Sequence, residues 1–188
     1  MTRKPENFIS VKISPCESPV KRQLVIIRHG KAESFGIVSD DYARTLVPDG
    51  IKEAKWTGSA LKKNGINPGL YLASAAPRAF YTLRFIASVL EADPEQVIGD
   101  RELYSARRES LLETIRNFPD DVSCAAICGH NPEISDLIPL LAKSPERLPF
   151  LNTADAVVME FPEGLSWSEI PETGTILHFF SQPGRRIS

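Results

Sequence analysis

The chain has 188 residues, and 42% hydrophobic with 24% charged residues is the composition of one globular domain able to bury a sizeable core. Its formal net charge of −2 gives no general attraction to nucleic acid or anionic lipid, which excludes binding that relies on overall charge. No window approaches about 18 consecutive apolar residues, and the N-terminus lacks an apolar signal core, so we expect a cytoplasmic protein without membrane association.

The first part of the chain shows no regular pattern. Residues 1–22 combine charged side chains with three prolines, and we predict a flexible N-terminal extension there. The alternative is an edge strand built on four apolar side chains, namely Phe8, Ile9, Val11 and Ile13. Residues 23–183 are expected to form a single domain, followed by a C-terminal tail at 184–188.

From residue 24 onward, strand-like and helix-like segments alternate. A short apolar run at 24–27 predicts a buried strand, and the segment 48–64 predicts an amphipathic helix with Pro48 at its first position. Further strands are predicted at 70–73, 97–99, 124–128, 156–161 and 175–180, and further helices at 79–92, 110–118 and 132–141. This alternation favours βαβ units, so we expect a three-layer α/β/α sandwich around a mostly parallel central sheet.

The three cysteines favour reduced thiols over disulfides or a metal site. They are odd in number and have no metal-ligand spacing. If 124–128 is a strand, Cys124 and Cys128 lie about 13 Å apart at about 3.3 Å per residue, too far for a disulfide. Cys16 falls in the predicted extension.

Three of the predicted strands end in polar segments that suit phosphate binding. These segments are Arg28-His29-Gly30, residues 74–78 and Gly129-His130-Asn131. Because the carboxyl ends of parallel strands lie at one edge of a sheet, we expect the three segments to meet. Two of the three histidines in the chain fall in them, which packing alone does not explain.

The residue types predict phosphoryl transfer at this edge. A neutral imidazole can accept a phosphoryl group, and a neighbouring guanidinium offers planar donors to its oxygens. His29 and Arg28 fit these two roles, and Gly30 lets the backbone approach an anion closely. Asn131 is the predicted N-cap of the following helix, which would place His130 beside a helix N-terminus.

Taken together, these segments resemble the histidine phosphatase superfamily, also called phosphoglycerate mutase-like, and within it the small SixA-type phosphohistidine phosphatases. The resemblance covers most of residues 24–183 and is carried by RHGKAES, ARTLVPDGIKEA, SAAPRAFYTL, RELYSA, CGHNPEIS and TADAVVMEF. It implies a phosphoglycerate mutase-like fold and an enzyme that needs neither metal nor cofactor. The larger mutases carry an asparagine soon after the RHG motif, whereas Ser34, Phe35 and Gly36 occupy that region here.

The resemblance also implies roles for individual residues. His29 would be the phosphorylated nucleophile, while Arg28 and Arg78 clamp the phosphoryl oxygens and His130 completes that set. Glu102 stands where many members carry the acid that protonates the leaving group. The further substrate contacts that we expect are Arg44, Gly30, Asn131 and Ser74.

The expected reaction is phosphate release through a phosphohistidine enzyme intermediate, with phosphohistidine on a protein as the substrate. Few residues separate Tyr104 from the next predicted helix, so no large cap covers the site, and an open site suits a protein side chain. One alternative is a phosphomonoesterase for a sugar, nucleotide or other metabolite phosphate, and another is a catalytically silent phosphate-binding module. We expect a monomer or weak dimer.

Overall fold

The computed structural model describes residues 21–36, 40–144 and 150–184. These residues form six strands, which are β1 (Gln23–Arg28), β2 (Leu70–Ser74), β3 (Ile98–Asp100), β4 (Cys124–Gly129), β5 (Ala156–Glu160) and β6 (Thr175–Phe180). The α-helices are α1 (Pro48–Lys63), α2 (Pro77–Val89), α3 (Arg108–Arg116) and α4 (Glu133–Leu141). Three short 3₁₀ helices are η1 (Pro94–Gln96), η2 (Glu102–Tyr104) and η3 (Trp167–Glu169).

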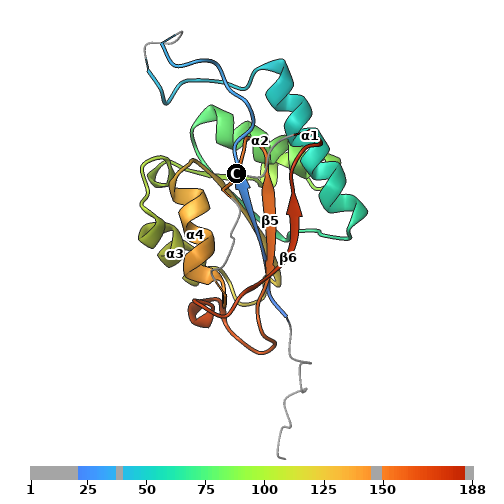
Figure 1. Cartoon of the computed structure of the whole chain (residues 1–188), viewed down its shortest axis with the longest axis vertical. Helices are drawn as coiled ribbons and strands as arrows, with labels where there is room; N and C mark the ends of the chain where they lie inside the picture. The colour runs from blue at the N-terminus through green and yellow to red at the C-terminus, as the bar shows by residue number, and fades with distance from the viewer. Residues whose placement is uncertain (1–20, 37–39, 145–149, 185–188) are drawn as a thin grey trace, which may run out of the picture.

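The strands form one sheet in the order β3-β2-β4-β1-β5-β6, which confirms the predicted mostly parallel sheet. β1, β2, β3 and β4 run parallel to one another, whereas β5 and β6 extend the sheet in antiparallel pairs. Helices α1 and α2 cover one face of the sheet, and α3 and α4 cover the other (Figure 1). This is the expected three-layer α/β/α sandwich.

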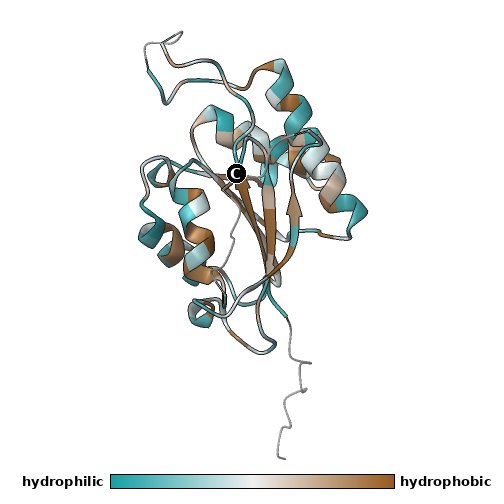
Figure 2. Ribbon diagram, in the orientation of Figure 1, coloured by the Kyte–Doolittle hydropathy of each residue, from teal (hydrophilic) through white to brown (hydrophobic). Residues whose placement is uncertain are grey.

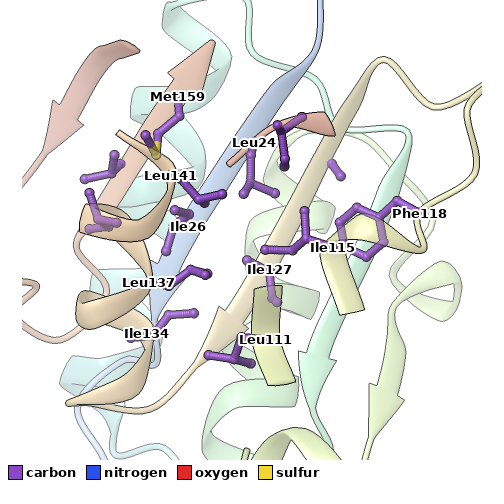
Figure 3. Close-up of a cluster of buried hydrophobic side chains, with 14 of the residues drawn as sticks. Leu24, Ile26, Leu111, Ile115, Phe118, Ile127, Ile134, Leu137, Leu141 and Met159 are labelled. Atoms are coloured by element: carbon purple, nitrogen blue, oxygen red, sulfur yellow. The ribbon is translucent and has the colours of Figure 1, made fainter. Parts of the chain in front are cut away.

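The apolar run of β1 supplies both halves of the core. Side chains of a strand alternate between the two faces of its sheet, so a strand covered on both sides must be apolar throughout. Leu24 and Ile26 belong to the cluster against α3 and α4 (Figure 3), while Val25 and Ile27 belong to the cluster against α1 and α2. All four side chains are fully buried. Figure 2 shows the result as an apolar sheet between helices whose outer faces are largely polar.

The carboxyl ends of three central strands lie at the same level of the sheet. Ile27 of β1 and Ala73 of β2 both pair with Cys128 of β4. The residues that follow each strand, including His29 and His130, therefore emerge at one edge, as the sequence predicted.

Two helices begin earlier than the sequence predicted. α2 starts at Pro77 rather than at residue 79, because the fixed φ of proline suits the first helical position. Arg78 therefore lies in the first turn of α2 and is buried there. α3 starts at Arg108 rather than at residue 110, and residues 102–104, predicted as a loop, form η2.

The prediction that Asn131 caps α4 is wrong. The N-cap position of α4 belongs to Pro132, and α4 has no side-chain cap. The Asn131 amide instead donates to the Leu151 carbonyl at 2.8 Å and accepts from the Ser135 hydroxyl at 2.7 Å. Because both ends of its side chain are occupied, Asn131 joins the start of α4 to the segment around Leu151.

The predicted N-terminal extension and C-terminal tail fall mostly outside the described residues, as does the alternative strand at Phe8 to Ile13. Within the described part, Arg22 is buried and well held. It donates to the Leu165 carbonyl at 2.6 Å, pairs with Asp120 at 2.9 Å and lies 5.5 Å from the centre of the Trp167 ring. The domain's contacts therefore include Arg22, which precedes the first strand.

The two cysteines of β4 are buried free thiols. Burial raises the pKa of both, that of Cys124 to about 12. Cys16 lies outside the described residues. Among the residues described, no group of three or more His, Cys, Asp or Glu side chains is arranged to hold a metal ion. In the same part of the chain, no helix has the length and hydropathy needed to cross a membrane.

Candidate active site

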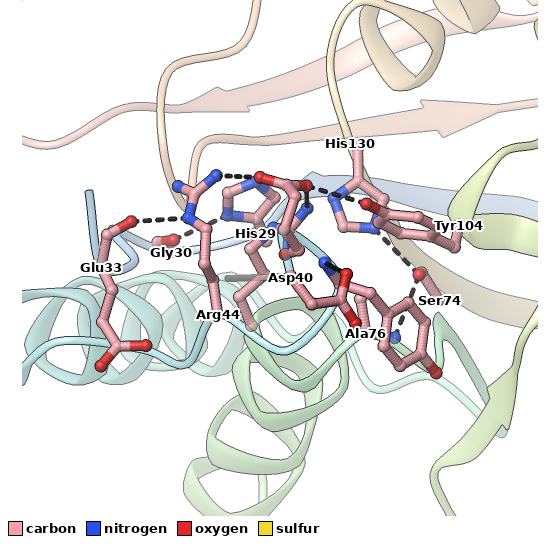
Figure 4. Close-up of polar contacts among 12 residues, drawn as sticks. His29, Gly30, Glu33, Asp40, Arg44, Ser74, Ala76, Tyr104 and His130 are labelled. Atoms are coloured by element: carbon pink, nitrogen blue, oxygen red, sulfur yellow. Dashed lines mark hydrogen bonds and ion pairs between the residues drawn. The ribbon is translucent and has the colours of Figure 1, made fainter. Parts of the chain in front are cut away.

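The carboxyl edge of the sheet brings His29 and His130 together. His29 follows β1 and His130 follows β4, and the His29 amide donates to the Gly129 carbonyl at 3.1 Å. The two ring centroids lie 5.1 Å apart, with 55° between the ring planes. Figure 4 shows the rings side by side, with Tyr104 next to His130. Two histidines separated by about a hundred positions in the chain thus share one site.

His29 is a neutral imidazole whose lone pair is on Nε2. Its Nδ1 lies 2.8 Å from the Gly30 carbonyl oxygen. A carbonyl oxygen only accepts hydrogen bonds, so Nδ1 carries the proton and Nε2 is unprotonated. Burial lowers the pKa of His29 to about 4; three nearby arginines act in the same direction, and the Gly30 contact opposes them. His29 is therefore a competent nucleophile at neutral pH.

A hydrogen-bonded chain joins the His29 segment to Arg78. The Gly30 amide donates to the Thr82 hydroxyl oxygen at 2.8 Å, and Thr82 donates to the Arg78 carbonyl at 2.6 Å. Thr82 is fully buried. The sequence analysis missed Thr82, although its place one helical turn after Arg78 was a usable signal.

Gly30 packs closely against the start of α1. A Cβ at Gly30 would lie 2.7 Å from the Gly50 carbonyl oxygen, a backbone atom with little freedom to move. We expect Gly30→Ala to lower the free energy of unfolding by about 1–3 kcal/mol, because the backbone at Gly30 or at Gly50 must move to make room for the new Cβ. It should also reduce turnover, because the shifted Gly30 carbonyl would no longer orient His29. Urea unfolding measures the first effect.

The control for this variant is Gly69→Ala. A Cβ at Gly69 would meet only the Cys124 carbonyl oxygen, at 3.9 Å, which is ordinary contact. We expect Gly69→Ala to change stability by less than about 0.5 kcal/mol. Equal stabilities for the Gly30 and Gly69 variants would show that close packing at Gly30 is unimportant.

His130 is oriented by Ser74. The His130 Nε2 lies 2.9 Å from the Ser74 hydroxyl oxygen, and this oxygen accepts from the Ala76 amide at 3.3 Å. The Ser74 hydroxyl donates its proton to Nε2, so the proton of the neutral ring is on Nδ1. Its Nδ1 is buried and has no hydrogen-bond partner within the described part of the chain. Burial and the neighbouring His29 ring lower the pKa of His130 to about 3. Ser74 is fully buried, so the structure places it behind His130 rather than in the predicted role of a direct substrate contact.

Arg78 reaches the same site from α2. Its Nη1 donates to the Asp41 carbonyl at 2.6 Å, and its Nη2 pairs with the Asp41 carboxylate at 2.9 Å. Its Nε is buried and unpartnered among the residues that the structure describes. Asp41 thus occupies Nη1 and Nη2 of the guanidinium, while Nε remains as a donor for an anion.

Arg28 is the last residue of β1, directly before His29, and it is partly buried. Its Nη1 donates to the Leu151 carbonyl at 2.9 Å, the same oxygen that Asn131 binds. The shared contact ties the ends of β1 and β4 to the segment around Leu151. Asn131 has both ends of its amide engaged in this way, and its contact with a substrate stays a prediction.

Asp41 gathers several of the charged groups of the site, and the sequence analysis missed it. Its carboxylate accepts from Arg44 at 2.6 Å, from Arg78 at 2.9 Å and from the Tyr104 hydroxyl at 2.8 Å. Arg44, a predicted substrate contact, also donates to the Glu33 carbonyl at 2.7 Å (Figure 4). The hydrogen bond from Arg44 is the main cause that lowers the pKa of Asp41 to about 2. The three-residue spacing of Asp41 and Arg44 was the available sequence signal.

Glu102 lies apart from the histidines. It begins η2, is exposed, and its carboxylate makes no hydrogen bond or ion pair within the described residues. It lines a surface hollow of about 610 Å³, which we call the outer hollow. The lining consists of Asp40, Tyr42, Arg101, Glu102, Tyr104 and Ser105. The Tyr104 ring meets His130 edge-on at 5.4 Å, so the outer hollow adjoins the histidine pair.

The lowered pKa values of the two histidines predict how the protein responds to acid. Unfolded histidine titrates near pH 6.5, whereas His29 and His130 titrate at about 4 and about 3 when folded. At a pH between the folded and the unfolded pKa, the unfolded chain binds more protons at these histidines than the folded protein does. The free energy of unfolding should therefore fall as the pH falls from about 6.5 to 4. We expect ¹⁵N spectra to show both rings neutral at about pH 5.5. An imidazolium signal from either ring at that pH would contradict the buried neutral state.

Fold and site together define an α/β protein whose parallel strands carry a neutral histidine beside a second histidine and buried arginine side chains. No family model matches the chain. An uncharacterized protein of Mycobacterium tuberculosis is 33% identical over 135 residues, which cover 71% of this chain and 77% of that protein. A 2,3-bisphosphoglycerate-dependent phosphoglycerate mutase of Treponema denticola is 26% identical over 161 residues, or 82% of this chain and 61% of the mutase.

Among solved structures, a putative phosphohistidine phosphatase SixA from Nakamurella multipartitia superposes with a TM-score of 0.68 at 22% identity. The superposition covers 89% of this chain and 100% of that one. The chain therefore has the fold of the phosphoglycerate mutase-like histidine phosphatases.

Proposed function

We propose that the protein is a metal-independent phosphatase that forms a phosphohistidine intermediate on His29 and removes phosphate from phosphohistidine on a protein. One observation carries the proposal. A neutral His29 with its lone pair on Nε2 lies beside two buried donors, Arg78 Nε and His130 Nδ1, that lack partners in the described part of the chain. Buried donors are normally satisfied, so this arrangement favours an anion between them.

The reaction proceeds in two displacements. Nε2 of His29 attacks phosphorus, and the donors of Arg28, Arg78 and His130 neutralise charge on the phosphoryl oxygens. Water then attacks the phosphohistidine and releases phosphate. The cationic side chains supply the charge neutralisation for which other phosphatases use a metal ion, so the proposed steps need none.

The leaving group favours phosphohistidine over an alkyl ester. Imidazole leaves more readily than an alkoxide, so its departure depends less on a tightly held general acid. The exposed Glu102 carboxylate makes no hydrogen bond to a described residue that would hold it against a substrate. The outer hollow is also open enough to admit a side chain that projects from a protein surface.

The proposal is tested by comparing kcat/KM for a phosphohistidine-bearing protein with kcat/KM for a panel of sugar, nucleotide and other metabolite phosphates. We expect the phosphohistidine substrate to exceed every ester by at least about 10²-fold. A single ester that is preferred, with activity lost in Glu102→Gln, would instead identify a small-molecule phosphatase. The presence of Glu102 at the outer hollow is the observation that favours this second candidate.

Trapping of the phosphohistidine intermediate distinguishes a catalytically silent phosphate-binding module from the two candidate enzymes. Acid quenching during turnover of a ³²P-labelled substrate should leave acid-labile label on His29. A protein that binds vanadate but never becomes labelled would have kept the anion site without the chemistry. Action on a phosphorylated protein in the cytoplasm, as a monomer or weak dimer, remains a prediction.

A further inference from the structure

The carboxylate of Asp41 is the one acidic group that three elements of the site share. Arg44 comes from its own loop, Arg78 from α2 and Tyr104 from η2, and each donates to this carboxylate at 2.6–2.9 Å. The Asp41 carbonyl accepts a further bond from Arg78. These bonds cross 37 and 63 positions of sequence, so Asp41 is positioned by the tertiary structure rather than by its own segment.

Asp41 lies between the histidine pair and the outer hollow. Arg78, which holds one carboxylate oxygen, is buried beside the histidines and lies 5.6 Å from the centre of the Tyr104 ring. Tyr104, which holds the same oxygen, meets His130 edge-on and lines the outer hollow. A phosphoryl group that is bound to His29 and to Arg78 would have Asp41 as a neighbour, because Arg78 holds the Asp41 carboxylate at 2.9 Å. Glu102 is exposed, and its carboxylate makes no hydrogen bond with any of these groups among the described residues.

We infer that Asp41, rather than Glu102, is the acid that protonates the leaving group. The inference rests on the proposed function, since it assigns a further catalytic residue to the same phosphoryl transfer.

Substrate binding itself would make Asp41 an acid. In the free protein the hydrogen bond from Arg44 and the charges of Arg44 and Arg78 hold the pKa of Asp41 at about 2, so the carboxylate is ionised. A phosphoryl group engages the positive charge of Arg78 and adds negative charge close to Asp41. Both changes favour the protonated carboxyl and raise its pKa. Asp41 therefore takes up a proton from solution when the substrate binds.

Over one catalytic cycle the phosphoryl group passes to His29 and then to water, and Asp41 gives up one proton and regains one. The bond between phosphorus and Nε2 of His29 forms as the bond to the leaving atom breaks. The electron pair of that bond stays on the leaving atom, which takes the Asp41 proton. In the second displacement the water oxygen bonds to phosphorus as the bond from phosphorus to Nε2 of His29 breaks, and the electron pair of that bond returns to Nε2. One proton of the water goes to the Asp41 carboxylate, and the other stays on the phosphate oxygen. Release of phosphate restores the ion pairs of Asp41, and the proton returns to solution.

The dependence of kcat/KM on the leaving group shows whether Asp41 acts as the acid or only positions other residues. We would compare kcat/KM for p-nitrophenyl phosphate, whose leaving group needs little protonation, with kcat/KM for phenyl phosphate, which has nearly the same shape. A parallel pair of phosphoramidates, phosphohistidine and phosphorylated lysine, extends the comparison to nitrogen leaving groups. For Asp41→Asn we expect a loss of about 10²-fold or more on the poor leaving group of each pair and less than about 10-fold on the good one.

Two further variants complete the experiment. Glu102→Gln should lose activity equally across each pair or not at all. Asp121→Asn changes an exposed carboxylate in the turn before β4, at the opposite end of that strand from His130, and should behave as wild type. Asparagine keeps the size of Asp41 and an acceptor for Tyr104, and circular dichroism checks that each variant is folded.

Each outcome decides the inference. A selective loss in Asp41→Asn alone supports it. A uniform loss would show that Asp41 only positions Arg78, and a gain in activity would show that it only competes with the substrate, so either result overturns it. A selective loss in Glu102→Gln also overturns it. Failure of the proposed function looks different, because wild type would then release no more phosphate than His29→Ala from any of the four substrates.

Discussion

Replacing His29 by alanine should lower kcat/KM for the phosphohistidine substrate by at least about 10³-fold and abolish the acid-labile phosphoenzyme. The proposed reaction runs through a covalent bond to Nε2, and His29 is the one histidine of the described residues whose ring is oriented by a backbone carbonyl. His130 cannot take over this role, because its Nε2 is bound to the Ser74 hydroxyl and its Nδ1 carries the proton of the neutral ring. Phosphate release and ³²P trapping measure the two losses.

The matched control is His178→Ala. His178 is the third histidine of the chain and lies on β6, at the edge of the sheet, where its ring stacks on Phe180. This change removes an imidazole of the same size without touching the site, so activity should stay within about twofold of wild type. Residual labelling in the His29 variant would mean that another residue carries the phosphoryl group, and the assignment of the nucleophile would have to be abandoned.

Replacing Arg78 by methionine should lower kcat/KM by about 10³-fold, which corresponds to about 4 kcal/mol of lost transition-state stabilisation. Methionine retains most of the length of the side chain and removes its charge and all of its donors. The buried Nε, which has no partner in the described chain, is the donor left for a phosphoryl oxygen. Steady-state kinetics measures the loss, and vanadate binding should weaken in parallel.

Arg84→Met is the control for this variant. Arg84 lies on the same helix, but it pairs with Glu95 at the surface and stacks on Phe80. Its loss should leave kcat/KM nearly unchanged. If Arg78→Met kept vanadate affinity and lost only kcat, Arg78 would serve the transition state alone, and the donors of Arg28 and His130 would account for binding of the ground state.

Much of the fold was predictable because it depends on local patterns. An apolar run of four residues at 24–27 becomes β1, and Pro48 begins α1 as expected. The convergence of His29 and His130 was also predictable. It follows from a general property of parallel sheets, in which all strands end at the same edge, and it needs no knowledge of individual side-chain contacts.

The sequence by itself therefore determined the layered architecture, the edge at which the site forms, and the two histidines at its centre. Only the tertiary structure decided which way the other polar side chains turn. Ser74 and Asn131 turn to protein partners instead of the substrate, and Asp41 joins Arg78 and Tyr104 across 37 and 63 positions. Periodicity reports which face of a strand or helix is buried. The direction of a loop side chain depends instead on donors and acceptors that distant segments bring to it, and no local pattern encodes these.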